Sequence, residues 1–457
     1  MKKLLGSTLA LALLVPAGAN AELLKNLKVS GSLEVDAVSA NNVTDFQTKK
    51  YDNISTVQTR LMVHTDWDVL DDVHAHLSLD KNNRTYGTGA ESLQAVQNNV
   101  ILDEAYVKID KLFGALDTTI GRQYYGEAGD LVIYFGPKYN LYGMPITALD
   151  GGRFDWNGEK VGLTLLAAKV AGGALGASDA GNVDLAGIDL HAKPMDNVTG
   201  SVYVYDRTTI RSGSATTAPV GTINVVGNDY LYVAGLKGKV TLGGAWAKAE
   251  FDKDFGQNRT YAGTTGASTF NGNYTGMAAK LDAGVKVDVG VANVTGWGQY
   301  GIGSGGPTAN RNFTAIAGDY RPGGIYGRFL ASGQVGNNFS NSTLSDLQVI
   351  GVGVKGTPAA LNKLTAGLSW YNYRFQNIQG AAATANLINP GPPTRVAGSN
   401  QIGNEVDLDL TWQHSENVSV SAGYGDLQPN GFIKTQLAGN GGSNPVTMWY
   451  ADASIKF

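Results

Sequence analysis

The sequence predicts an all-β protein folded as a transmembrane antiparallel β-barrel of about 18 strands, with short periplasmic turns and long outer loops. Three observations lead to this prediction. The end of the chain, from Met448 to Phe457, alternates between apolar and polar side chains, as does a strand with one apolar and one polar face. The chain also begins with an export segment, and it is low in charge. A strand of a soluble sandwich alternates in the same way, so the other two observations are needed.

Residues 1–21 are predicted to be a secretory signal peptide. Two lysines follow the first methionine, Leu4 to Val15 is a short apolar run, and Ala19-Asn20-Ala21 is a small-residue cleavage site. The apolar run is too short to cross a bilayer as a helix, and no other run approaches that length. Because only helices and closed barrels span membranes, we expect residues 22–457 to form a single transmembrane β-barrel domain.

The composition excludes several classes of protein. Charged residues make up 16% of the 457 residues, against about a quarter in an average soluble domain. The 61 glycines and 21 tyrosines, without a long hydrophobic run, are typical of barrels whose strands face lipid. The absence of cysteine excludes disulfides, thiolate nucleophiles and cysteine-based metal sites. The formal charge of −4 gives no indication of nucleic-acid binding.

Amphipathic segments, joined alternately by short turns and long polar loops, predict 18 strands, with 16 as the alternative. The number must be even, because the first strand leaves the periplasm and the last strand returns to it. One short turn is expected at Lys237-Gly238-Lys239, and Arg311–Ser332 is either two further strands or a long loop. The predicted strands lie near 27–37, 57–67, 73–80, 104–110, 117–123, 150–157, 160–170, 185–194, 198–207, 229–237, 240–251, 273–283, 286–299, 346–355, 363–375, 403–414, 418–425 and 446–457.

The loop from Tyr124 to Asp150 is the first candidate for a constriction. It is dense in Tyr, Phe, Leu and Ile and contains two prolines, so it should not stay in water. It either folds inward against the barrel wall, or packs over the rim or against a neighbouring subunit. The segment 311–332 is the second candidate.

Alternation along the strands also predicts which side chains face the lumen. A barrel of this size leaves an aqueous channel, whose width and charges decide what passes. Both signs of charge are present, which indicates a solvated wall of mixed charge; a dedicated charge ladder, such as the acidic row at 405–409, is the alternative. The candidate pore-lining or constriction residues are Arg60, Lys108, Arg122, Asp130, Lys138, Arg153, Asp155, Arg207, Glu405, Asp407 and Asp409.

Three histidines lie on one predicted hairpin. On this hairpin His64 is expected to face His76 and Asp66 to face His74, and facing pairs on a sheet come within reach of a shared metal ion. Polar residues that line a pore need no metal, however. We therefore expect no bound metal and no cofactor, and keep the histidines as weak candidates.

Two sets of residues carry a family resemblance. The strand that ends in Phe457 resembles the closing strand of bacterial outer-membrane barrels, whose last residue is recognised by the barrel assembly machinery. Gly121-Arg122-Gln123, followed by a long loop and then Gly152-Arg153-Phe154-Asp155-Trp156, resembles porins of the alginate-export type. That resemblance implies an 18-stranded barrel with basic residues along a path for polyanions, here at Arg122 and Arg153. By alternation Arg122 shares a face with Ile120, so only a bulge at the rim would turn it inward.

The sequence thus predicts an outer-membrane porin for passive diffusion of small hydrophilic solutes. A selective export or uptake channel for an acidic or neutral saccharide is the alternative, and an adhesin or surface structural protein is a further one. An enzyme is not expected, since no Ser-His-carboxylate set is apparent. The expected partners are outer-membrane lipid, the assembly machinery and small hydrophilic solutes, but no nucleic acid. A homotrimer and a monomer both remain open.

Overall fold

The computed structural model is a closed antiparallel barrel of 18 strands within the part of the chain that it describes. The expected fold class is therefore confirmed, and the alternative of 16 strands is wrong. The predicted signal peptide, residues 1–21, lies outside the described residues. Those residues are 25–43, 46, 53–82, 100–171, 182–210, 228–258, 272–306, 309–330, 344–377, 399–431, 433–434 and 444–457.

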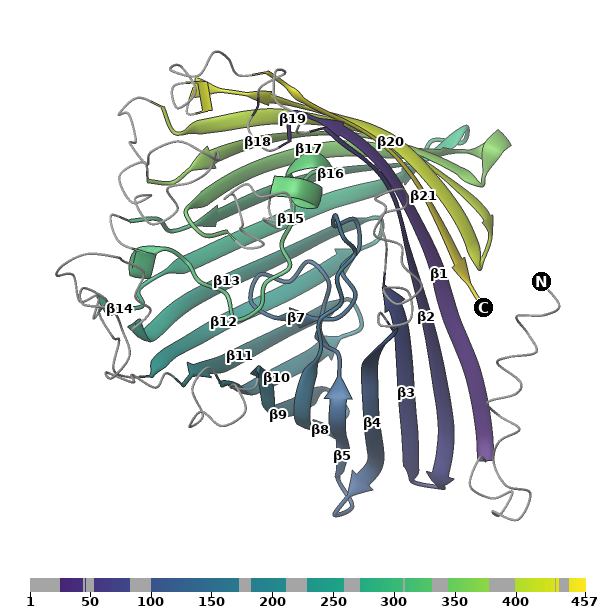
Figure 1. The fold of residues 1–457 in the computed structure, drawn as a ribbon, viewed down its shortest axis with the longest axis vertical. Coiled ribbons are helices and arrows are strands. Elements are labelled where there is room, and N and C mark those ends of the chain that lie inside the picture. The colour runs from purple at the N-terminus through teal and green to yellow at the C-terminus, as the bar shows by residue number, and fades with distance from the viewer. Residues whose placement is uncertain are drawn as a thin grey trace.

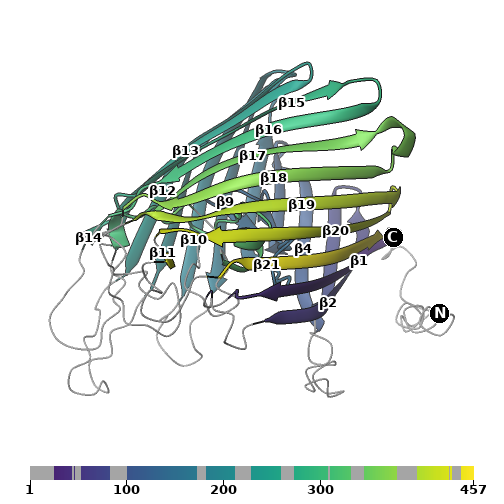
Figure 2. The ribbon, with the colours of Figure 1, turned by 90° about the horizontal axis from the view of Figure 1, so that it is seen from above.

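The barrel closes between its first and last strands. β1 (Lys25–Asn41) pairs antiparallel with β2 (Ile54–Leu70) on one side and with β21 (Val446–Lys456) on the other. Both views show the purple β1 beside the yellow β21 (Figures 1 and 2). The backbone N–H of Phe457 also donates to the carbonyl of Gly31 over 3.0 Å. The C-terminal segment thus closes the barrel, as its alternation predicts.

The other wall strands follow one another round the sheet in chain order. Short turns connect them at the end where β1 begins and β21 finishes, and longer segments connect them at the other end. By the usual arrangement of such barrels the short-turn end is periplasmic. The strands are β3 (Val73–Asn82), β4 (Val100–Leu112), β5 (Leu116–Gln123), β8 (Leu149–Asn157), β9 (Val161–Ala171), β10 (Val183–Met195), β11 (Val198–Thr209), β12 (Asp229–Leu242), β13 (Ala245–Asn258), β15 (Met277–Asp288), β16 (Ala292–Gly303), β17 (Leu347–Pro358), β18 (Leu364–Phe375), β19 (Gln401–Ser415) and β20 (Val418–Pro429).

The outer surface of the wall is apolar. Along each strand every second side chain points outward, and many of these are large aliphatic or aromatic groups left exposed. So much exposed apolar surface suits lipid and not water. Examples from around the barrel are Val29, Leu61, Ile188, Val202, Leu281, Val352, Leu410 and Val420.

The expected turn at Lys237–Lys239 is wrong. β12 continues through it to Leu242, and the chain turns at Gly243-Gly244. The two lysines keep the alternation, with Leu236 and Leu242 exposed on the opposite face. A Lys-Gly-Lys sequence has the composition of a turn, but here the lysines face a wet lumen and stay in the strand. The strands predicted at 273–283 and 286–299 are likewise displaced, because β15 runs to Asp288 and the turn lies at 289–291.

The remaining short elements lie within the long outer connections. β6 (Tyr125–Gly126) and β7 (Tyr134–Phe135) form a small hairpin between β5 and β8. Between β16 and β17 lie a 3₁₀ turn (η2, Ala309–Arg311) and one turn of π-helix (η3, Tyr326–Leu330). The described part of 311–332 thus contains no wall strand, so that segment is a loop. None of the helices among the described residues is long and apolar enough to cross a membrane. A further 3₁₀ turn, η4 (Ala359–Leu361), connects β17 to β18.

Candidate functional site

Two inward-folded segments occupy the lumen and bind each other. We call residues 124–148 the first loop and residues 309–330 the second loop; Figure 1 shows β7 and the green turn of η3 between the barrel walls. The backbone N–H of Tyr134 donates to the carbonyl of Ala317 (2.8 Å), and the N–H of Ala317 donates to the carbonyl of Val132 (2.9 Å). The two segments that the sequence singles out separately therefore form one unit.

The first loop contributes apolar side chains to a buried core that it shares with the wall and the second loop. Leu131, Val132, Ile133 and Phe135 are buried, as the loop's composition predicts. Asp130 fixes the start of this run, because its Oδ1 accepts from the backbone N–H of Val132 (2.9 Å) and of Ile133 (3.3 Å). A carboxylate that caps adjacent N–H groups in this way holds a tight turn.

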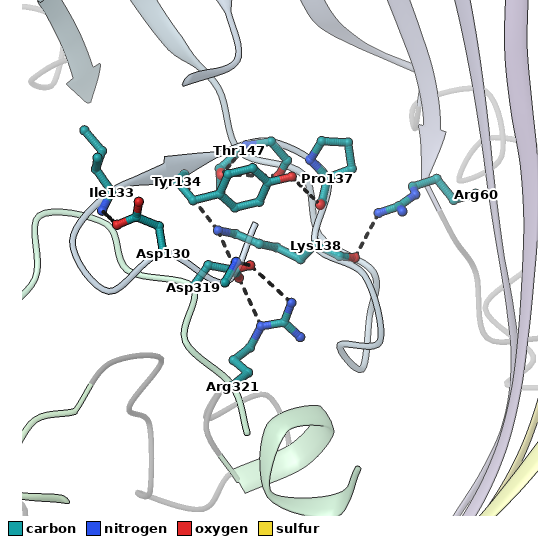
Figure 3. Close-up of polar contacts among 11 residues, drawn as sticks. Arg60, Asp130, Ile133, Tyr134, Pro137, Lys138, Thr147, Asp319 and Arg321 are labelled. Carbon is teal, nitrogen blue, oxygen red and sulfur yellow. Dashed lines mark hydrogen bonds and ion pairs between the residues drawn. The ribbon is translucent and has the colours of Figure 1, made fainter. Parts of the chain in front are cut away.

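A buried charge cluster lies where the two loops meet (Figure 3). Lys138 Nζ donates to the carbonyl of Tyr134 (3.0 Å) and lies 3.3 Å from a carboxylate oxygen of Asp319. Arg321 Nε donates to the same carboxylate over 3.0 Å. Burial lowers the pKa of Lys138, and the charge of Asp319 opposes that shift. Burial also raises the pKa of Tyr134 to about 12. Two cations around one carboxylate join the loops electrostatically.

Arg60 ties the first loop to the β1–β2 wall. Its side chain is 1% exposed, and its Nε donates to Glu34 over 2.7 Å. Its Nη1 donates to the carbonyls of Lys138 (3.1 Å) and Met144 (3.2 Å) in the loop. Arg60 therefore acts as an anchor between wall and loop.

The opposite wall holds the loops in a similar way. Lys237 on β12 donates to Asp130 of the first loop over 2.8 Å. Arg207 on β11 donates to the carbonyl of Ala315 in the second loop over 3.4 Å and lies 3.9 Å from Asp229. Charged wall residues on both sides thus position the loops across the lumen.

The acidic row on β19 receives the second loop. Glu405 is fully buried and accepts from the backbone N–H of Ile325 (2.6 Å) and Tyr326 (3.1 Å). Asp407 accepts from the N–H of Gly324 over 3.0 Å. Carboxylates that accept N–H bonds at the start of a helical turn stabilise it. Asp409, the third member of the row, instead accepts from the phenol of Tyr450.

Arg328 holds the other side of η3. It donates to Asp36 on β1 over 2.6 Å and to Asp452 on β21 over 3.4 Å. Its guanidinium carbon also lies 4.8 Å from the centre of the Tyr450 ring. Strands β1 and β21 are neighbours only because the barrel closes, and both bind the guanidinium of Arg328.

The described residues line two spaces beside the loops. One, of about 480 Å³, lies between the two loops and the β15–β21 wall, and another, of about 1070 Å³, lies toward the periplasmic turns along β8–β13. Polar, charged and tyrosine side chains line both, and the charges are of both signs. Charged or tyrosine residues of the smaller space are Tyr139, Lys280, Asp319, Tyr320, Arg321, Arg328, Tyr371, Asp407, Asp409 and Tyr450. Those of the larger include Glu127, Asp130, Arg153, Asp155, Lys160, Asp189, Lys193, Lys237, Lys239 and Lys248.

The other candidate residues fall outside the loop contacts. Arg153 and Asp155 form an ion pair of 2.7 Å on the lumen wall, and Lys108 pairs with Asp110 (2.7 Å) near the periplasmic end. Arg122 faces outward. It pairs with Asp150 over 2.8 Å and lies opposite Ala105 with no register shift there, so the bulge that would turn it inward is not formed.

The predicted register of the histidine hairpin is wrong by two residues, because Asp66 pairs with His76 and His64 pairs with Ser78. The structure also divides the three histidines. His64 and His76 lie together with Glu104 on the inner wall. His74 lies nearer the turn, with its ring nitrogens 2.6 Å from Asp68 and 3.1 Å from Asp110.

Three anchoring residues are absent from the predicted pore-lining residues, although two of them lie in the second candidate segment: Asp319, Arg328 and Lys237. Arg328 interrupts the otherwise apolar or small run Tyr326–Leu330, which is the one available signal that it needs a buried partner. Lys237 is hidden by its turn-like neighbours. The partners themselves, far apart in sequence, follow only from the closed fold.

No protein-family model matches the chain, and no curated protein matches it. Several crystal structures of Pseudomonas aeruginosa proteins are similar in fold. OccK11 (OpdR) is 10% identical, with 96% of this chain and 99% of that chain covered at a TM-score of 0.52. OpdK, crystallised with vanillate, is 12% identical, with 95% of this chain and 99% of that chain covered at a TM-score of 0.52. OccK2 (OpdF), in complex with glucuronate, is 10% identical, with 95% of this chain and 99% of that chain covered at a TM-score of 0.53.

At such low identity the likeness extends to the fold alone. OpdK is an outer-membrane protein, and the match to its structure covers 94% of this chain and 99% of that chain. This chain has the fold of an outer-membrane β-barrel channel.

Proposed function

We propose that this protein is a narrow outer-membrane channel for passive diffusion of small hydrophilic solutes. One observation carries the proposal: two loops fold into the lumen, bind each other, and are fixed to the wall by buried charges. Beside the loops the described residues line a space of about 1070 Å³ and a smaller, polar one of about 480 Å³. Because pore width and lining charges decide passage, such a space admits small solutes and excludes large ones.

The charges around that space balance. The smaller space is lined by three cationic and three carboxylate side chains, namely Lys280, Arg321 and Arg328, and Asp319, Asp407 and Asp409. Four of these six groups already have ion-pair partners: Lys280 within the wall, Arg321 and Asp319 within the second loop, and Arg328 on β1. We therefore expect weak selectivity between simple anions and cations.

A second candidate is a channel that prefers small acidic saccharides or other small carboxylates. The larger space carries several lysines, among them Lys160, Lys193 and Lys239. Two proteins of similar fold were crystallised with vanillate and with glucuronate, which are both carboxylates. The likeness to alginate exporters supports this candidate only through Arg153, because Arg122 faces outward.

Recording from purified protein in planar bilayers tests the proposal. We expect stepwise conductance and a reversal potential close to zero in a salt gradient. A folded protein that never conducts contradicts it. Liposome swelling should be fast with pentoses and hexoses and slow with longer oligosaccharides.

The same recordings separate the two candidates. Clear anion selectivity that falls in Arg153→Gln and Lys239→Gln favours the carboxylate channel. Lys25→Gln is the matched control, because Lys25 pairs with Asp71 at a periplasmic turn, away from the larger space. Unchanged selectivity in all three variants removes the second candidate.

The remaining expectations belong to the same proposal. We propose export by the signal peptide at 1–21, insertion by the assembly machinery through the strand ending in Phe457, and no enzymatic activity. A homotrimer and a monomer are distinguished by the mass of the folded protein in detergent.

A further inference from the structure

A cluster of metal-binding side chains lies on the inner wall, apart from the charge clusters that hold the loops. His64 on β2, His76 on β3 and Glu104 on β4 each offer one donor atom, and these three atoms lie within 4.8 Å of one another. His76 Nε2 is 3.4 Å from a carboxylate oxygen of Glu104. Three neighbouring strands thus bring two imidazoles and a carboxylate to one point.

The two histidine nitrogens of the cluster have no hydrogen-bond partners. His64 Nδ1 and His76 Nε2 are both buried, and neither has such a partner in the structure. The side chain of His76 is only 10% exposed, and that of Glu104 is 11% exposed. A buried ring nitrogen without a hydrogen-bond partner costs free energy, and a bound metal ion would offset that cost.

A second carboxylate orients His76. The Nδ1 atom of His76 lies 2.6 Å from a carboxylate oxygen of Asp66. When the Nδ1–H group donates to Asp66, the lone pair of Nε2 points toward the cluster. Histidines that bind metal ions typically donate their other ring N–H to a carboxylate or a carbonyl, which fixes the ring and raises its basicity. The ring of Tyr106 stacks on His76 at 4.7 Å and restricts it further.

We propose that His64, His76 and Glu104 bind one transition-metal ion of the Zn²⁺ type, with Asp66 as the positioning residue for His76. Two imidazoles and one carboxylate suit zinc and cobalt and do not suit calcium or magnesium, which prefer all-oxygen sites. Three protein ligands leave a fourth position for water or for a ligand from the lumen. A small inward movement of the side chains brings the donors to ordinary metal–ligand distances of about 2.0–2.2 Å.

The site adjoins the start of the first loop. The other carboxylate oxygen of Glu104 accepts from the backbone N–H of Tyr124 over 3.1 Å. The phenol of Tyr124 donates to Asp103, the neighbour of Glu104. A bound ion would therefore fix β2, β3, β4 and the root of the first loop together.

Titration of metal-free, folded protein in detergent with Zn²⁺ tests the inference. A chromophoric chelator reports competition, and Co²⁺ in place of Zn²⁺ reports its ligands by visible absorption. We expect one Zn²⁺ per chain, with His64→Gln, His76→Gln or Glu104→Gln each weakening binding at least about tenfold. Asp66→Asn keeps all three ligands and should weaken binding by about 10–100-fold.

His74→Gln is the matched control. His74 lies on the same face of β3, two residues from His76, but its nitrogens lie against Asp68 and Asp110. Binding should be unchanged in this variant, and circular dichroism and the heat-dependent gel mobility of the folded form check each barrel. Absence of Zn²⁺ binding by the folded wild-type protein overturns the inference, as does binding that none of the ligand variants weakens. These titrations need no conductance, so their result is separate from that of the proposed function.

Discussion

Arg60 shows how a lumen charge serves as a structural anchor. It lies on the inner face, as alternation predicts, but solvent hardly reaches it and its donors are used by Glu34 and by loop carbonyls. A guanidinium presents several donors in a fixed plane, so it can hold a carboxylate and two carbonyls at once. Lysine at this position would not supply the same contacts.

Arg60→Met should destabilise the barrel and loosen the first loop. Removing one partner of a buried pair leaves Glu34 uncompensated, which costs about 3–5 kcal/mol. Urea titration of the folded form measures this cost, and single-channel recording should show a larger, noisier conductance.

Arg153→Met is the control for that experiment. Arg153 forms a single ion pair with Asp155 and is about one-third exposed, so its removal should cost less than about 1 kcal/mol. Equal losses in the two variants would contradict the anchoring role of Arg60.

Glu405→Gln should release the start of η3. The carboxylate uses both oxygens to accept backbone N–H groups, and an amide replaces one acceptor with a donor. Leaving a buried N–H unpaired costs roughly 1–3 kcal/mol. Limited proteolysis should then cut within 311–330 faster than in the wild-type protein. Asp409→Asn, in the same row but bound to Tyr450, should leave the cleavage rate unchanged; faster cleavage there as well would argue against loop docking by Glu405.

At the scale of elements, the two loops act as one body because their backbones pair. Ile133 and Ala317 form an isolated parallel bridge, flanked by the hydrogen bonds of Tyr134 and Val132. The chain has no cysteine, so an introduced pair reports this contact without interference.

Ile133→Cys combined with Ala317→Cys should form a disulfide on mild oxidation, because neighbouring ladder positions come within disulfide reach. Non-reducing electrophoresis after proteolysis detects the cross-link. Ile133→Cys with Val291→Cys, at a periplasmic turn where Val291 is 77% exposed, should not cross-link. Failure of the first pair would show that the loops do not meet.

Much of this arrangement is predictable from the sequence. The number of strands, the face on which each side chain lies and the closing strand follow from the alternation of apolar and polar residues. Lipid on one side of the wall and water on the other impose this alternation. The turn at Lys237–Lys239 is mispredicted because local composition imitates a turn while the lumen tolerates lysine. Long-range pairs such as Arg328 with Asp36 depend on closure of the barrel, and no local pattern contains that information.

At the scale of the whole molecule, closure depends on a tight fit between the chain ends. A Cβ placed on Gly31 would lie 2.3 Å from the carbonyl oxygen of Met62 and 2.6 Å from the ring of Phe457. Gly31 is therefore required where the last residue crosses β1.

Gly31→Val should reduce the yield of folded barrel, since neither the Met62 backbone nor the terminal residue can give way without disturbing the seam. The heat-dependent mobility shift of the barrel measures this yield. Gly296→Val is the control: a Cβ there meets open space, and valine favours strands. Normal folding of Gly31→Val would contradict the closure described for β1 and β21.

The most direct test of the whole account compares two single-channel conductances. One is that of the wild-type protein, and the other is that of a variant in which 127–147 is replaced by a short Gly-Ser linker. If the loops narrow the lumen of an open barrel, the wild type conducts in small steps and the folded variant in clearly larger ones. A wild type that does not conduct, or a folded variant with unchanged steps, would contradict the account.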